Sequence, residues 1–170
     1  VGHMVIAYGI KVKITPRSLI AIGVIAGFFS PPGHTGVPAV AVDIPPVASL
    51  VRQVMGDLGQ PRLIVPTGVS PHSYAMRPSQ ARTLQNADIV FWVGRDLTVG
   101  LARAAKALAT NAVSVSLIDV PGITLLSFRH GTTFETHGHN NGTDPHVWLD
   151  PENARVWLEV IAAELAKLDP

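Results

Sequence analysis

The chain has 170 residues, enough for one domain with a substantial hydrophobic core. Its formal net charge at pH 7 is +1 and it has no run of lysine and arginine, which argues against nucleic acid as the main partner. It contains no cysteine, so we expect no disulfide, no thiolate metal site, no cysteine nucleophile and no lipid anchor on cysteine. Any metal site must then be built from histidine, carboxylate, backbone carbonyl or water.

The N-terminal part differs from the rest of the chain. A positively charged stretch, residues 11–17, precedes the apolar run 19–29, and a Ser-Pro-Pro-Gly breaker follows at 30–33. This order is typical of a secretory signal peptide, and the run is shorter than the roughly 20 residues that span a bilayer. We therefore expect residues 1–39 to be a leader that is removed, leaving a periplasmic or secreted domain over 40–170. The alternative is that the apolar run is a buried strand or helix of the domain.

Strand and helix patterns alternate beyond the leader. Short apolar runs predict strands at 39–43, 62–66, 88–93 and 113–117, with 123–126 as a candidate fifth. Apolar residues at three- and four-residue spacing, or an alanine-rich composition, predict helices at 47–58, 79–86, 97–109 and 150–168. This alternation predicts an α/β fold with a parallel four-stranded sheet flanked by helices, in which ligands bind beyond the carboxyl ends of the strands.

Two of these helices have a sequence signal at their start. Ser79, which follows Pro78, is expected to cap the second helix. Asp150, Pro151 and Glu152 combine a capping residue, a first-turn proline and an acidic residue, and so mark the start of the last helix.

Two histidines that each follow a proline are the most informative feature. His72 lies in Ser-Pro-His-Ser-Tyr at 70–74, and His146 lies in Asp-Pro-His-Val-Trp-Leu-Asp-Pro at 144–151. Because proline fixes its own φ and restricts the residue before it, both imidazoles are presented on a stiff backbone. Imidazole is the commonest protein ligand for metals such as zinc, so metal binding is the leading hypothesis. The alternatives are a loop histidine bonded to the backbone and a core histidine bonded to a neighbouring aspartate.

Two aspartates, Asp144 and Asp150, flank His146. Both are candidates for a hydrogen bond that orients the imidazole, a role that carboxylates often have beside metal ligands. The alternative role for both is capping, which the position of Asp150 favours.

The segment 128–143 carries three more histidines, His130, His137 and His139, in a stretch rich in glycine, threonine and asparagine. It is either a mobile loop that collects metal ions or an ordinary solvated loop, and its composition favours neither.

Catalytic motifs are missing from the chain. It has no G-x-G-x-x-G after the first strand, no G-x-x-x-x-G-K-[ST], no H-E-x-x-H and no G-x-S-x-G. Acidic residues are few, so a hydrolytic metal centre would lack an obvious general base. We therefore expect a binding protein rather than an enzyme.

Three segments, 65–79, 84–94 and 144–151, carry a combination of motifs that is more specific than any one of them. They resemble the first ligand segment, the next helix and strand, and the second ligand segment of the metal-type (cluster A-I) substrate-binding proteins of ABC transporters. The similarity runs from about Ala39 to the end of the chain.

The resemblance implies that His72 and His146 are the first two ligands of a periplasmic zinc receptor. Members of this family are two-lobed and hold the metal between the lobes, and the chain resembles the N-terminal lobe without the C-terminal lobe, which supplies a third histidine and a carboxylate. Zinc-type members have a histidine-rich loop where this chain has residues 128–143, so the resemblance favours zinc over manganese. Two ligands do not complete a tetrahedral site, so we expect a weak, open one.

These observations predict a receptor that captures Zn²⁺ outside the cytoplasm for uptake by a membrane ABC permease, with no role for nucleic acid. The alternatives are a Mn²⁺ receptor or adhesin, an extracytoplasmic zinc hydrolase and a folded but inactive remnant.

Overall fold

The structure is a computed structural model that describes residues 36–128 and 142–168. All of these belong to one compact unit, residues 33–170. No helix in the described ranges is long and apolar enough to cross a membrane. Most of the predicted leader lies outside the described residues. So do the three histidines of the predicted loop: His130, His137 and His139.

Four parallel strands form one sheet with the order β2-β1-β3-β4, which confirms the predicted α/β architecture. The strands are β1 (Val40–Val42), β2 (Arg62–Leu63), β3 (Ile89–Trp92) and β4 (Val113–Ser116). The chain turns to one side of β1 to form β2 and returns to its other side to form β3. The carboxyl ends of β1 and β3 therefore make a topological switch point, where ligands of such sheets usually bind.

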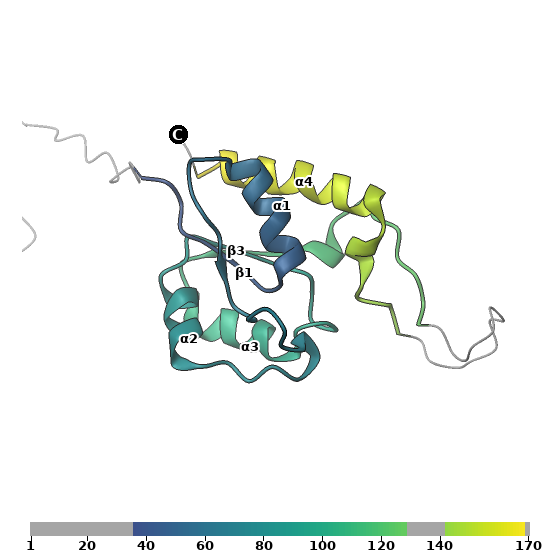
Figure 1. Ribbon diagram of the computed structural model, residues 1–170, viewed down its shortest axis with the longest axis horizontal. Helices are drawn as coiled ribbons and strands as arrows, with labels where there is room; N and C mark the ends of the chain where they lie inside the picture. The colour runs from purple at the N-terminus through teal and green to yellow at the C-terminus, as the bar shows by residue number, and fades with distance from the viewer. Residues whose placement is uncertain (1–35, 129–141, 169–170) are drawn as a thin grey trace, which may run out of the picture. The chain divides into compact units, whose positions relative to one another are not determined.

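Helices cover both faces of the sheet. α1 (Pro45–Met55) packs against α4 (Pro151–Ala166) on one face, and α2 (Pro78–Gln85) packs against α3 (Val99–Leu108) on the other (Figure 1). Because both faces are covered, the central strand β3 is buried along its whole length, as its continuous apolar run predicts.

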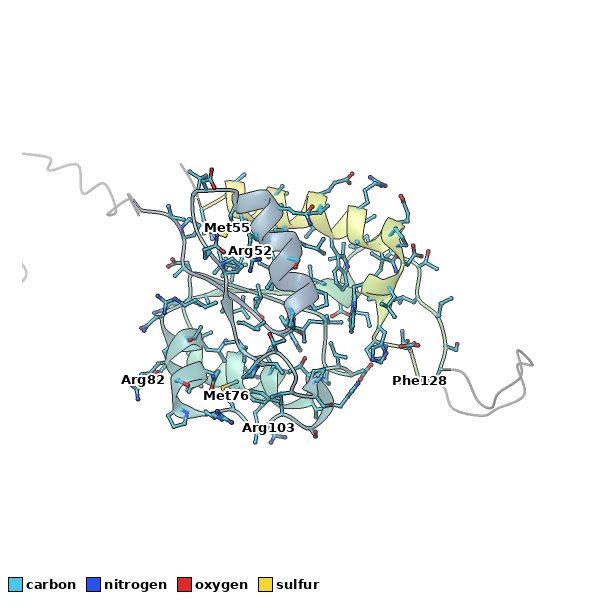
Figure 2. The ribbon with its side chains drawn as sticks, in the orientation of Figure 1. Arg52, Met55, Met76, Arg82, Arg103 and Phe128 are labelled. Carbon is cyan, nitrogen blue, oxygen red and sulfur yellow. The ribbon has the colours of Figure 1, made fainter. Side chains whose placement is uncertain are left out.

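The hydrophobic core has two parts, one on each face of the sheet. On the face covered by α1 and α4, Phe91 of β3 belongs to the same cluster as Met55 of α1 and the fully buried Trp157 of α4. Trp92 packs on the opposite side, where Met76 borders the cluster under α2 and α3 (Figure 2). Alternate side chains of one strand thus fill both parts of the core.

The predicted strand at 62–66 is too long. β2 ends at Leu63 instead of residue 66, although Ile64 and Val65 still donate backbone hydrogen bonds to Val42 and Asp43 at 2.8 and 2.9 Å. The chain therefore follows β1 a little further before it turns at Pro66, whose nitrogen has no hydrogen to donate.

The candidate fifth strand at 123–126 is wrong. The structure has only an isolated antiparallel bridge between Ser127 and Thr143 there, and Leu125 and Leu126 are exposed. Asn153 in α4 instead bonds both backbone groups of Thr124 at 2.7 and 2.9 Å, which occupies the groups that a strand partner would need.

Of the two predicted helix caps, the one at α2 is wrong and the one at α4 is confirmed. α2 begins at Pro78 without a side-chain cap, and the Ser79 hydroxyl donates to Gln80 instead. Proline suits this first position because its missing N–H would have no helical partner. At α4, Asp150 accepts a hydrogen bond from Glu152 N at 2.9 Å, as predicted for its cap.

Candidate metal centre

His72 is presented by a turn that follows β2. Gly68 adopts a φ of 81°, a conformation that favours glycine, and reverses the chain. The short 3₁₀ turn Pro71–Ser73 then carries the imidazole, with its ring exposed. Glycine and proline therefore shape the chain that follows β2, and this chain presents His72 beyond the carboxyl end of the strand.

His146 is held by Asp144. The Asp144 Oδ1 atom accepts from the backbone N–H of His146 at 3.0 Å and lies 2.6 Å from its Nδ1. With Nδ1–H donating to this carboxylate, the Nε2 atom keeps its lone pair for a ligand. The second aspartate, Asp150, caps α4 and forms no hydrogen bond with His146 in the part of the chain that the structure describes.

The two imidazoles lie together although they are far apart in the sequence. The ring centroids of His72 and His146 are 5.4 Å apart and their planes are tilted by 56°. In a tetrahedral zinc site the Zn–N bonds place each ring centre roughly 3.2 Å from the ion, and hence the two centres about 5.2 Å apart. The observed separation therefore allows both rings to reach one ion.

A cavity of about 270 Å³ lies in front of the two histidines. Its remaining walls are apolar and come from Trp148 and from the chain that follows β1 and β2. The residues after these two strands are Ile44, Pro45, Pro46, Val65, Pro66, Gly68, Val69 and Pro71. An apolar wall limits the access of water to an ion that the imidazoles hold. The cavity lies beyond the carboxyl ends of the strands, as the fold predicts.

The two ends of the segment 128–143 lie against each other. They are joined by hydrogen bonds from Phe128 N to Gly142 O at 3.1 Å and from Asp144 N to Leu126 O at 2.7 Å. Asp144, whose carboxylate holds His146, is itself part of this hydrogen-bonded pair of chain segments.

The described residues contain no group of three or more histidine, cysteine, aspartate or glutamate side chains close enough to hold an ion. His72 and His146 are thus two ligand candidates without a third among the ranges that the structure covers. Water or a donor from elsewhere must fill the other positions of a four-coordinate ion.

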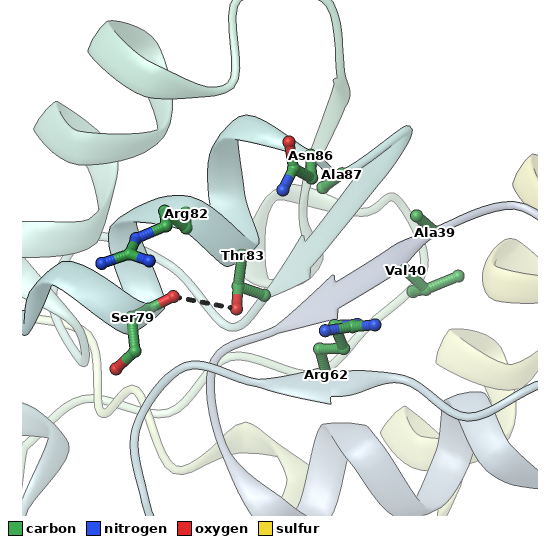
Figure 3. A pocket seen from close by; sticks show the side chains of 8 residues that line it. All are labelled: Ala39, Val40, Arg62, Ser79, Arg82, Thr83, Asn86 and Ala87. Atoms are coloured by element: carbon green, nitrogen blue, oxygen red, sulfur yellow. Dashed lines mark hydrogen bonds between the residues drawn. The ribbon is translucent and has the colours of Figure 1, made fainter.

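A second hollow lies at the opposite end of the sheet. It has a volume of about 190 Å³ and its polar lining consists of Arg62, Ser79, Arg82, Thr83 and Asn86 (Figure 3). None of its lining residues is a histidine or a carboxylate. Two guanidinium groups repel a cation, so this hollow does not compete with the histidine cavity for metal.

Asp43 is a buried charged residue that the sequence patterns did not single out. It directly follows β1, is fully buried, and its carboxylate accepts hydrogen bonds from Ile44 N, Val93 N and the Thr98 hydroxyl at 2.8, 2.9 and 3.1 Å. The one available signal was an aspartate at the end of an apolar strand, where parallel sheets place their functional groups.

Comparison with solved structures defines the class of protein. A zinc-bound deletion mutant of ZnuA superimposes with a TM-score of 0.65 and 30% identity, over 77% of this chain and 46% of that one. The fold is therefore that of the ZnuA-type metal-binding receptors.

The model of the family described as zinc-uptake complex component A, periplasmic (ZnuA), matches residues 40–170, and the chain belongs to this family. The high-affinity zinc uptake system protein ZnuA of Paracoccus denitrificans is 40% identical over 92% of the chain and 56% of its own length. A manganese-binding lipoprotein, MntA of Halalkalibacterium halodurans, is 29% identical over 73% of the chain. The chain spans about half the length of the curated relatives that it matches.

Proposed function

We propose that the chain belongs to a receptor that captures Zn²⁺ outside the cytoplasm and delivers it to a membrane ABC permease, with His72 and His146 as two of the zinc ligands. The observation that carries this proposal is the pair of imidazole rings 5.4 Å apart, one of them oriented by the Asp144 carboxylate, in front of an apolar cavity. Membership of the ZnuA family supports the choice of zinc and the periplasmic location. The leader is then removed on export.

Manganese is the second candidate, because one relative is named a manganese-binding lipoprotein. Mn²⁺ prefers oxygen ligands, whereas zinc accepts imidazole nitrogen readily. The described walls of the cavity offer two imidazoles and no carboxylate, which favours zinc.

A hydrolase needs a general base beside a metal-bound water. None of the residues that line the cavity is acidic, and the Asp144 carboxylate is engaged with His146. The site therefore suits binding and release of an ion better than turnover of a substrate.

Calorimetric titration of the chain with Zn²⁺ tests the proposal. We expect about one equivalent to bind, and the double variant His72→Ala/His146→Ala to lose this binding. The matched control is the triple variant His130→Ala/His137→Ala/His139→Ala, which should keep most of the affinity. Loss of binding in the triple variant alone would move the site to the loop and contradict the proposal.

The pH dependence of binding provides a second test. Zinc needs neutral imidazole, so protons compete with the ion. We expect affinity to fall as the pH drops through the range in which imidazole becomes protonated. An affinity that does not depend on pH in this range would argue against histidine ligands.

A further inference from the structure

Asp43 occupies the switch point of the sheet. It follows the last residue of β1, and its carboxylate reaches Val93, which follows the last residue of β3. The side chain therefore joins the carboxyl ends of the two central strands from a fully buried position.

The third bond of this carboxylate comes from Thr98, the residue that precedes α3. Thr98 is itself buried, and its hydroxyl donates to Asp43 at 3.1 Å instead of capping the helix, so that α3 begins without a side-chain cap. The Asp43–Thr98 bond ties the start of α3 to the end of β1.

Asp43 also supports the wall of the histidine cavity. Its carboxylate accepts from Ile44 N, and its backbone carbonyl accepts from Val65 N at 2.9 Å. Ile44 and Val65 both line the cavity in front of His72 and His146. A change in the bonding of the Asp43 carboxylate therefore acts directly on the cavity wall at Ile44, without touching either histidine.

The groups that contact the Asp43 carboxylate are all neutral. Burial raises its pKa from 3.8 to about 6, and the hydrogen bonds from Val93, Thr98 and Ile44 lower it only in part. The charged side chains on the surrounding strands, turns and helices are exposed, and none of them pairs with Asp43 in the described ranges: Arg52, Arg62, Arg95, Asp96, Arg103 and Lys106. The titratable groups on the far side of the wall are His72 and His146.

We propose that Asp43 is a positioning residue of the histidine cavity, and that its ionised carboxylate, by tying Ile44 to Val93 and Thr98, holds the cavity wall at Ile44 in the arrangement that binds a divalent metal ion. When the carboxyl takes up a proton it becomes a donor, and it faces two N–H groups that cannot accept. Only the Thr98 hydroxyl can turn and accept from it. A cation in the cavity also favours the ionised form, so metal binding and proton binding at Asp43 oppose each other.

This inference rests on the proposed zinc-binding function, and it is tested on the full chain with Zn²⁺ as the probe. We measure zinc affinity from about pH 5.5 to about pH 7.5 for the wild type and for Asp43→Asn, which has no carboxyl to titrate. The histidines contribute equally to both profiles. We expect the ratio of wild-type to variant affinity to fall by about fivefold or more on acidification.

A second pair of variants keeps the test independent of how well Asp43→Asn folds. Thr98→Val removes the hydroxyl at nearly constant volume and should weaken zinc binding at neutral pH, whereas Thr98→Ser keeps the hydroxyl and should restore it. Equal affinities of the Val and Ser variants would overturn the inference, as would parallel pH profiles of the wild type and Asp43→Asn.

Nuclear magnetic resonance of the metal-free chain separates this inference from the proposed function. We expect the amide signals of Ile44 and Val93 to titrate together with the Asp43 carboxyl, with a midpoint near 6, and to do so also in the His72→Ala/His146→Ala variant. Amides that do not follow the carboxyl would overturn the positioning role. If they follow it but the wild type binds no zinc, the proposed function is the part that fails.

Discussion

Replacing Asp43 by asparagine should remove a pH dependence of folding stability that one buried carboxyl produces. Burial raises the pKa of Asp43 from 3.8 to about 6, and this difference in proton affinity between the folded and unfolded chain amounts to about 3 kcal/mol. Because the folded protein holds the proton more tightly than the unfolded chain, the stabilisation is fully present below pH 3.8 and is lost as the pH rises through about 6. Between about pH 4.5 and 7.5 the change is about 2 kcal/mol.

Urea unfolding at several pH values, followed by circular dichroism, measures this effect. The quantity of interest is the difference in unfolding free energy between the wild type and Asp43→Asn at each pH, since the other groups titrate alike in both proteins. We expect the wild type to gain about 2 kcal/mol relative to the variant on going from about pH 7.5 to 4.5. A difference that stays constant, or one that changes in the opposite direction, would refute the assignment of a raised pKa to this carboxyl.

The remaining predictions concern the two aspartates beside His146 and the core. Asp144→Ala should lower zinc affinity by about 10–100-fold in calorimetry, because the imidazole loses the carboxylate that orients it. Asp150→Ala is the matched control; it should keep the affinity and lower the unfolding free energy by about 1 kcal/mol through the lost cap. Equal losses of affinity in the two variants would show that both aspartates orient the ring. Trp157→Ala should cost about 3–5 kcal/mol in urea unfolding, and Trp157→Phe should cost clearly less, because the buried indole N–H has no hydrogen-bond partner among the described residues. A Phe variant as unstable as the Ala variant would contradict this account of the core.

Local sequence patterns were sufficient for the architecture of this domain. The continuous apolar run that contains Ile89–Trp92 predicted a strand covered on both faces, and the structure buries every residue of it. Asp150 and Pro151 predicted the start of α4 because capping depends on neighbours within one turn. The errors fell where a distant residue decided the outcome, as at Thr124, whose backbone groups are taken by Asn153.

At the candidate metal site, local sequence patterns and contacts between distant residues also decided different things. The prolines before His72 and His146 marked two stiffly held imidazoles, but no local pattern states that the rings lie 5.4 Å apart. That distance exists because the sheet brings the chain after β2 and the chain before α4 to one edge. The sequence by itself thus determined the approximate positions of the four strands and most helices, and the candidate ligands. The tertiary structure alone decided that the ligands meet and that Asp43 is buried among donors from Val93 and Thr98, because both depend on contacts between residues far apart in the chain.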